Sequence, residues 1–235
     1  MAKTSALPKF IQLSVMLIRE IAAGHLTDGA RLPPERDMAD DLGVAVGTLR
    51  KALADVEAKG LLDRVQGSGN YVRHRPAVDS VYAFFRLELL KGGGLPTAKV
   101  LRVDRLPKPD AFARLGGDSE GHRIIRLRSL GGVLIALEEI WLDGAQREEI
   151  AVSDLSDSLY HFYRHELGVV IASVEDRIGL DPMPAWTPDT FHLKTGEMAG
   201  YIERVSWTAA KEPAEFSRTW YDAKRAVYIS RMGKG

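Results

Sequence analysis

The chain has 235 residues, of which 45% are hydrophobic and 27% are charged, so its length and balance suit two globular domains rather than a disordered segment. Its formal net charge is zero, which argues against a protein that merely coats nucleic acid, and the absence of cysteine excludes disulfides and thiolate metal or redox sites. No apolar run approaches the ~20 residues of a membrane span, and residues 1–10 lack a signal-peptide core, so we expect a cytoplasmic protein with no membrane partner.

The N-terminal part of the chain contains three helical patterns. Apolar side chains recur at helical spacing over residues 9–23. A second, short helix is predicted over residues 34–42, because Pro34 suits a first helical turn and Glu35 suits the positive end of the helix dipole. A third helix is predicted over residues 48–59.

The short gap between the second and third helices predicts a helix-turn-helix, whose later helix enters the major groove of DNA. The apolar stripe of that helix faces the core, so Thr48, Arg50 and Lys51 point outward near its N-terminal end. Arg50 suits a bidentate contact with guanine or phosphate, whereas Lys51 suits phosphate alone. The alternative is that both are ordinary solvated helix charges.

Residues 61–72 form two short apolar runs around Gly67-Ser68-Gly69, which predicts a β-hairpin. Gly67 and Gly69 permit the positive φ of a tight tip and a close approach of backbone to phosphate. Glycines are ordinary in any hairpin turn, so their meaning depends on the helices that precede them.

This order of parts over residues 8–73 resembles the winged helix-turn-helix domain of GntR-type bacterial transcription regulators. The resemblance implies DNA contacts from the start of the second helix, the start of the third helix and the wing tip. These contact residues are Arg36, Thr48, Arg50, Lys51, Gly67 and Gly69. The chain departs from the family pattern at Ala45 and Val46, where relatives carry a capping serine and a DNA-contacting arginine. Docking geometry should therefore be kept, while base preference need not follow that of relatives.

From residue 97 onward the pattern changes to β-rich runs. Strands are predicted over residues 97–105, 123–130, 133–142, 169–178, 200–208 and 215–221, with helices over 109–115, 156–167 and 187–194. Residues 77–96 give no decisive pattern, because the apolar run at 81–90 suits either a helix or a buried strand. Strands joined mostly by hairpins predict an α+β domain with an antiparallel sheet.

Residues 95–232 resemble the UTRA effector-sensing domain of the HutC-type branch of GntR regulators. The resemblance rests on four segments: Arg126-Leu127-Arg128, Ile135-Ala136-Leu137-Glu138, Asp157-Ser158-Leu159-Tyr160, and the closing run from Glu215 to Tyr221. It implies a fold similar to chorismate lyase with a small-molecule pocket in each subunit. The implied effector contacts are Arg126, Arg128, Glu138, Ser158, Tyr160, Glu215 and Tyr221. We therefore expect a DNA-binding domain over residues 1–75, a linker over 76–95, and an effector-binding and dimerisation domain over 96–235.

Arg126 and Arg128 lie two apart on one predicted strand, so they share a face and suit a carboxylate or a phosphate. The alternative is that they pair with Glu138 or Glu139 across the hairpin. The two glutamates are adjacent and point to opposite faces, which argues against a paired acid and base.

Asp157, His161 and His165 recur at four-residue spacing, which could gather three metal ligands. No fourth ligand stands at a telling spacing, so no metal and no other cofactor is expected.

The two halves together predict a ligand-responsive transcriptional regulator that is not an enzyme. We expect a homodimeric repressor that leaves a palindromic operator in double-stranded DNA when it binds a small, polar, anionic effector. The alternatives are an enzyme with a lyase-like pocket fused to a DNA-binding domain, and a DNA-binding protein whose sensing domain has lost its effector.

Overall fold

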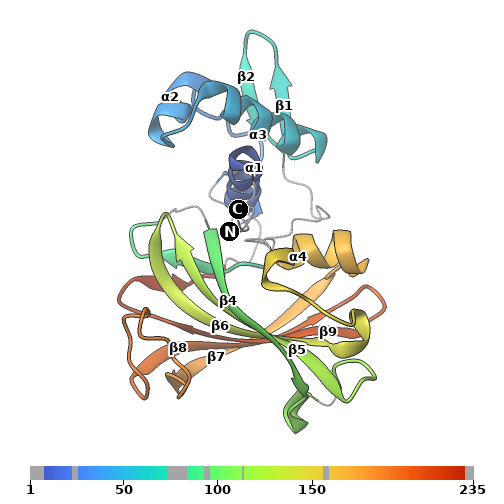
Figure 1. The fold of residues 1–235 in the computed structure, drawn as a ribbon. Helices are drawn as coiled ribbons and strands as arrows, with labels where there is room; N and C mark the ends of the chain where they lie inside the picture. Colours follow the sequence, from blue (N-terminus) through green and yellow to red (C-terminus); the bar gives the residue numbers. More distant parts are fainter. Residues whose placement is uncertain are drawn as a thin grey trace. The chain divides into compact units, whose positions relative to one another are not determined.

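The computed structural model describes residues 8–22, 26–73, 84–92, 96–112, 114–155 and 159–230. The chain divides into two compact units, the smaller made mostly of residues 7–86 and the larger mostly of residues 87–227 (Figure 1). The predicted domain boundaries fall in or beside ranges that the structure does not describe, so they stay predictions.

The described part of the smaller unit holds three helices and a hairpin. These are α1 (Lys9–Ala22), α2 (Glu35–Asp41), α3 (Val46–Ala58), β1 (Leu62–Val65) and β2 (Gly69–Val72). The predicted helix-turn-helix and wing are confirmed, although α3 begins two residues earlier than predicted. Ala45 is the N-cap of α3 and provides no side-chain cap, as expected where alanine replaces serine.

One apolar core joins the elements of this unit. It contains Leu17 and Ile21 from α1, Leu49 and Leu53 from α3, and Val72 from the wing, all almost fully buried. The helical spacing of the first four side chains aims one stripe of each helix into this core. The outer side of α3 is thereby left to solvent or to a ligand.

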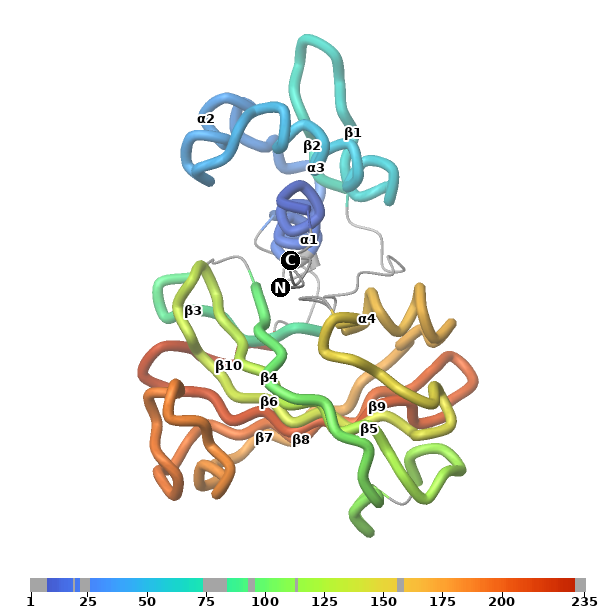
Figure 2. Tube along the Cα trace, in the orientation of Figure 1, coloured from blue at the N-terminus to red at the C-terminus, as the bar shows by residue number. Residues whose placement is uncertain are grey.

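The larger unit is built on an antiparallel sheet in which the described strands follow the order β4-β5-β6-β9-β8-β7. The strands are β4 (Pro96–Pro107), β5 (Glu120–Leu130), β6 (Val133–Asp143), β7 (Ser173–Pro182), β8 (Met198–Trp207) and β9 (Pro213–Tyr221). A separate pair, β3 (Leu87–Leu89) with β10 (Ala226–Tyr228), lies beside it (Figure 2). Short helical turns connect the strands: η1 (Asp110–Phe112), η2 (Gly144–Gln146), η3 (Val152–Asp154), α4 (Leu159–Phe162) and the π-helical η4 (Tyr163–Leu167). The predicted α+β class is confirmed.

Of the helices predicted in this unit, one is wrong and another is shorter than predicted. No helix spans residues 187–194, where Thr187 N–H bonds Pro184 O and Phe191 N–H bonds Pro188 O, each at 2.9 Å, in successive turns. Pro188 alone does not account for the difference, because a proline in the first turn of a helix is tolerated. The helix predicted at 109–115 is only the single turn η1.

Two further boundaries differ from prediction. The strand predicted over 169–178 runs instead over Ser173–Pro182. The helix predicted over 156–167 is helical over its described part, 159–167, and changes from α to π at Tyr163. It ends at Gly168, whose φ of +68° is the left-handed conformation that glycine favours.

The two faces of the six-stranded sheet differ in chemistry. Leu127, Leu137 and Trp220 lie opposite one another in neighbouring strands and pack with Met183 and Phe191 in an apolar core. The residues that alternate with them along each strand point to the other face. That face carries buried polar side chains.

Candidate effector site and DNA-binding surface

An Arg–Glu–Arg triad lies on the polar face of the sheet. Arg126 on β5 stands opposite Glu138 on β6, and its Nε donates to Glu138 Oε2. Arg128 donates to both oxygens of Glu138, from Nε and Nη2, each at 3.3 Å. The alternative of pairing across the hairpin is thus realised with Glu138, whereas Glu139 points to the opposite face and accepts from Arg123 Nε at 2.6 Å.

The triad is buried, and its carboxylate is ionised. The side chains of Arg126, Arg128 and Glu138 are 8%, 6% and 9% exposed. Burial alone would raise the pKa of Glu138, but the charges of Arg126 and Arg128 outweigh it and lower that pKa, so the carboxylate is ionised. Glu215 on the same face is a further acidic neighbour of Arg126. Arg126 Nη1 is buried and has no hydrogen-bond partner among the described residues.

A second polar group on the same face surrounds Glu215 on β9. Tyr163 Oη donates to Glu215 Oε2 at 2.6 Å, and Ser206 Oγ donates to Oε1 at 3.1 Å. Tyr160 Oη lies 3.1 Å from Ser206 Oγ and 3.4 Å from Glu215 Oε1. Burial raises the pKa of Glu215 despite these donors. Burial also raises the pKa of both tyrosines, so they remain protonated donors.

Arg204 and Asp176 extend this polar layer toward the edge of the sheet. Arg204 Nε and Nη2 donate to the two oxygens of Asp176 at 2.5 and 2.6 Å, a bidentate pair between β8 and β7. The layer therefore crosses the sheet from β5 to β7, with α4 and η4 lying over it (Figure 1).

In the smaller unit, Glu35 at the start of α2 joins the third helix to the wing. Its Oε2 accepts from Arg50 Nε at 2.6 Å, and its Oε1 accepts from Arg64 Nη2 at 3.2 Å. The hydrogen bond from Arg50 lowers the pKa of Glu35. Arg50 keeps 63% of its side chain exposed, so it remains accessible at the outer side of α3.

The wing tip requires its glycines. Gly67 and Gly69 have φ of +76° and +126°, which side chains with a Cβ rarely adopt. A Cβ at Gly69 would lie 3.0 Å from Arg31 Nε, so this position is also sterically close to its neighbour.

Comparison with known proteins matches each half of the chain to a protein family. The family described as "UTRA domain" matches residues 91–226, and the family described as "Bacterial regulatory proteins, gntR family" matches residues 12–72. The chain belongs to the GntR family of regulators. It is therefore a ligand-responsive, DNA-binding transcriptional regulator and not an enzyme.

Individual relatives agree with this assignment. The chain is 52% identical to the HTH-type transcriptional regulator SmoD of Agrobacterium fabrum over 97% of both chains. It is 26% identical to the mannosyl-D-glycerate transport/metabolism system repressor MngR of Escherichia coli over 73% of both chains. The crystal structure of the possible transcriptional regulator YydK from Bacillus subtilis shares the fold, with a TM-score of 0.54 and 22% identity over 96% of this chain and 99% of that chain.

In this GntR-family chain the predicted DNA-contacting residues gather at α2, α3 and the wing. Arg36 and Lys51 are exposed, and Thr48 is half-buried with its N–H bonded to Ala45 O at 2.9 Å. Their contact with DNA stays a prediction.

The predicted effector residues meet on one face of the sheet, except Ser158, which lies outside the described residues. Arg126, Arg128, Glu138, Tyr160 and Glu215 form the groups described above. Tyr221 is buried on the same face with its ring over Gly200, where an added Cβ would lie 2.3 Å from the ring.

Sequence reasoning missed Tyr163, Ser206, Arg204 and Asp176. The period-two alternation of Arg204 and Ser206 along β8 was a usable signal, because these positions pair with Ser217 and Glu215. Tyr163 could not be found this way, because the π-helical turn that aims it at Glu215 has no sequence pattern of its own.

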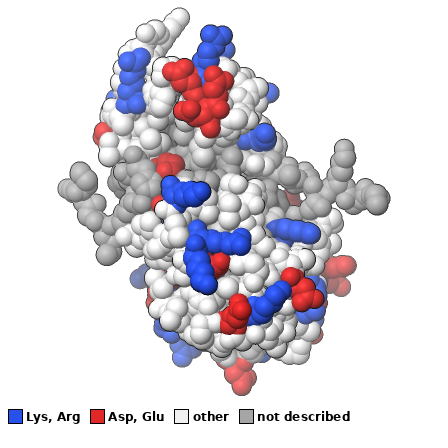
Figure 3. Space-filling model, turned by 90° about the vertical axis from the view of Figure 1, so that its left-hand side faces the viewer, with Lys and Arg blue, Asp and Glu red and all other residues white. Residues whose placement is uncertain are grey.

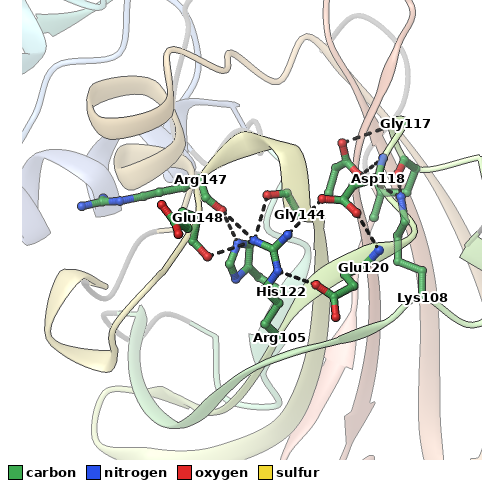
Figure 4. Close-up of polar contacts among 11 residues, drawn as sticks. Arg105, Lys108, Gly117, Asp118, Glu120, His122, Gly144, Arg147 and Glu148 are labelled. Atoms are coloured by element: carbon green, nitrogen blue, oxygen red, sulfur yellow. Dashed lines mark hydrogen bonds and ion pairs between the residues drawn. The ribbon is translucent and has the colours of Figure 1, made fainter.

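A further polar cluster, around Arg105, fastens the edge strand β4 to its neighbours (Figure 4). Arg105 donates from Nε to Glu120 at 2.7 Å, from Nη2 to Asp118 at 3.0 Å and from Nη1 to Glu148 O at 2.9 Å. His122 Nε2 lies beside it, 2.7 Å from the carbonyl of Arg147. These contacts satisfy one another, and we assign the cluster a structural role.

The predicted metal alternative gains no support from the part of the chain that the structure describes, where no group of three or more His, Asp or Glu side chains could hold an ion. Asp157 lies outside that part.

Among the described residues no helix is long and apolar enough to cross a membrane. On the face drawn in Figure 3, acidic and basic side chains are scattered, some of them next to one another, while most of the surface belongs to other residues.

Proposed function

We propose that the protein is a homodimeric repressor that binds a palindromic operator and is released by a small, polar, anionic metabolite. Because its target is DNA, it acts in the cytoplasm. The single observation that carries the choice of effector is the buried pair Arg126 and Glu138, in which Arg126 Nη1 has no hydrogen-bond partner among the described residues.

An anion fits this place for an electrostatic reason. A carboxylate or phosphate that reaches Arg126 Nη1 would supply the acceptor that this buried donor lacks among the described residues, and its charge would suit the neighbouring guanidiniums. Burial raises the pKa of Glu215, while Tyr163 and Ser206 donate hydrogen bonds to it. The tyrosine and serine hydroxyls around Glu215 then suit the polar, uncharged part of the same effector.

The name of one relative is consistent with this chemistry. MngR is called the repressor of a mannosyl-D-glycerate system, and a glycerate carries a carboxylate and hydroxyl groups. We infer a similar class of ligand here, not that compound.

Release from DNA requires that the effector prefer the conformation that does not bind the operator. Moving the balance from 1:99 to 99:1 takes roughly 5.5 kcal/mol of differential affinity. A charge contact available in only one arrangement of the triad can contribute strongly to such a preference.

The DNA side of the proposal uses Arg36, Thr48, Arg50, Lys51, Gly67 and Gly69. One winged domain reads few bases, so two copies related by a dyad would read a palindrome. If Arg50 reads a base, Arg50→Ala should cost ~1–3 kcal/mol of specific binding and leave nonspecific binding less affected.

The effector is tested by a thermal-shift screen of anionic metabolites, each paired with its uncharged analogue. A ligand at 100 times its Kd should stabilise the folded protein by about 2.7 kcal/mol. Arg126→Lys should weaken effector binding about 10- to 100-fold while operator affinity stays unchanged, because lysine keeps the charge and loses the fork.

Arg123→Lys is the matched control, since Arg123 lies on the same strand and pairs with Glu139 on the opposite face. It should leave effector binding unchanged. An uncharged apolar inducer, or an unaltered response of Arg126→Lys, would refute the assignment. If no metabolite binds, the alternative of a sensing domain without an effector becomes the better reading.

A further inference from the structure

The outer edge of β7 differs from the other edge of the sheet. None of the described strands pairs with β7 on its outer side, and it exposes Ile178 and Leu180 at 53% and 72%, with Met198 at 59% on the adjoining strand. The opposite edge strand, β4, exposes mainly charged side chains and Leu106 at 36%. Long edges with exposed apolar side chains invite pairing with another strand unless something covers them.

The backbone of this edge is also ready to pair. Met183 N–H bonds Glu197 O at 2.8 Å, which continues the register of β7 with β8. Because alternate residues of an antiparallel strand direct their N–H and C=O to the same neighbour, odd-numbered residues bond β8. The even-numbered Ile178 and Leu180 therefore direct theirs outward.

From these features we propose that β7 pairs antiparallel with β7 of a second copy of this chain, about a dyad at Gly179, to form a continuous sheet. This proposal deepens the homodimer of the proposed function and rests on it. The dyad places Ile178 opposite the partner's Leu180, and Arg177 opposite the partner's Asp181. Each pair occurs twice, so apolar contacts cover one face of the joint and opposite charges cover the other.

Neighbouring registers lack this complementarity. A dyad at Asp176 or at Arg177 would set that charge against its own copy, which is destabilising. A dyad at Ile178 would set Arg177 against glycine and Asp176 against leucine. Only the dyad at Gly179 matches apolar with apolar and cation with anion.

Gly179 itself suits the dyad position. In this register it forms a non-hydrogen-bonded pair with its copy, where Cα atoms approach to about 4.5 Å. Glycine has no side chain to crowd that approach, and no described atom lies within 4 Å of its Cβ position. Its φ is not in the left-handed region, so a small side chain can also be placed there for a test.

The test uses the full chain without DNA or effector and measures its oligomeric state by analytical ultracentrifugation. Leu180→Glu should weaken self-association about 100-fold, because two buried charges would face isoleucines across the joint. Leu106→Glu, on the other edge, is the matched control and should leave the dimer intact. Circular dichroism checks that both variants fold.

Cross-linking gives a second, independent measurement. The natural chain has no cysteine, so Gly179→Cys adds a single thiol per subunit. At about 4.5 Å between Cα atoms the two thiols are within disulfide reach, and mild oxidation should yield a covalent dimer. Leu106→Cys should not cross-link under the same conditions.

A Leu180→Glu protein that stays dimeric, or a Gly179→Cys protein that fails to cross-link, would overturn the interface and leave the proposed function standing. A wild-type monomer would overturn both the interface and the homodimer. If the interface is confirmed but wild type binds operator no better than random duplex, the interface stands and the proposed operator binding fails.

Discussion

The two faces of the sheet place similar charges in different surroundings. On the polar face, the Arg126–Glu138–Arg128 triad is no more than 9% exposed, and Arg126 Nη1 has no hydrogen-bond partner among the described residues. On the opposite face, Glu139 pairs with Arg123 at 2.6 Å and with Arg218 at 3.7 Å. Glu139 and Arg123 are almost as buried as the triad, whereas Arg218 is 32% exposed and lies over the Phe112 ring.

The difference in exposure between the two groups indicates which charges contribute to folding. Arg218 reaches solvent, so its pairing with Glu139 contributes little to stability, whereas the buried Arg123–Glu139 pair joins β5 to β6. The triad on the polar face carries a large desolvation cost that apolar side chains would avoid. This cost is the reason for proposing that the triad binds a ligand.

The largest expected effect is on the apolar face. Trp220 packs edge-on against Trp186 at 5.5 Å between ring centroids and donates from Nε1 to Asp181 at 2.9 Å. Trp220→Ala should lower the free energy of unfolding by about 3–5 kcal/mol, because it leaves a large cavity. Chemical denaturation measures this loss. Ligand selectivity should not change, and a changed preference between anionic and neutral ligands would contradict the division between faces.

Replacing the central carboxylate of each triad compares the faces directly. Glu138→Gln should destabilise the protein by about 2–3 kcal/mol, because two buried guanidiniums lose their counter-charge. Glu139→Gln should cost less, since Arg218 can turn to solvent. Saturating anionic effector should recover part of the Glu138→Gln loss and none of the Glu139→Gln loss. If both variants lose the same free energy of unfolding and the effector restores none of it, Glu138 and Glu139 both have a structural role.

Much of this arrangement was predictable from sequence. The hairpin of β5 and β6 follows from alternation around two glycines, and the same alternation separates Glu138 from Glu139. The helix predicted at 187–194 was wrong, and Pro188 did not exclude it, because the first turn of a helix tolerates proline.

Other features needed the structure. The pairing of Glu138 with both arginines depends on β5–β6 register, and the contact of Tyr163 with Glu215 depends on a π-helical turn. Sequence periodicity specifies neither of these.

The third prediction compares how Glu138 and Glu215, two carboxylates of the polar face, change the free energy of unfolding with pH. The raised pKa of Glu215 means that its contribution to stability falls as pH rises from its unfolded pKa toward its folded pKa. The lowered pKa of Glu138 has the opposite sign, so its contribution is present above its ordinary pKa and lost as pH falls. Unfolding free energies measured by denaturant titration from about pH 2 to 8 should show two changes. Glu215→Gln should remove the decline above the ordinary carboxyl pKa, and Glu138→Gln should remove the gain below it. Each tenfold change in proton affinity corresponds to about 1.4 kcal/mol. A Glu215→Gln protein with an unchanged pH slope would show that Glu215 is not the group responsible.

The smallest effect concerns Ser206, which joins Tyr160 to Glu215 on the polar face. Ser206→Ala removes one donor to Glu215 and should cost about 0.5–1.5 kcal/mol, a typical value for one hydrogen bond. It should also raise the pKa of Glu215 further, because a donor that favours the carboxylate is gone, so the decline in stability with rising pH should steepen. A double-mutant cycle with Glu215→Gln isolates this interaction from the loss of the hydroxyl itself. If the contact operates as the geometry indicates, Ser206→Ala should cost less in the Glu215→Gln background than in wild type. Additive losses would mean that Ser206 and Glu215 act independently, and the polar face would then be a set of separate pairs rather than one coupled site.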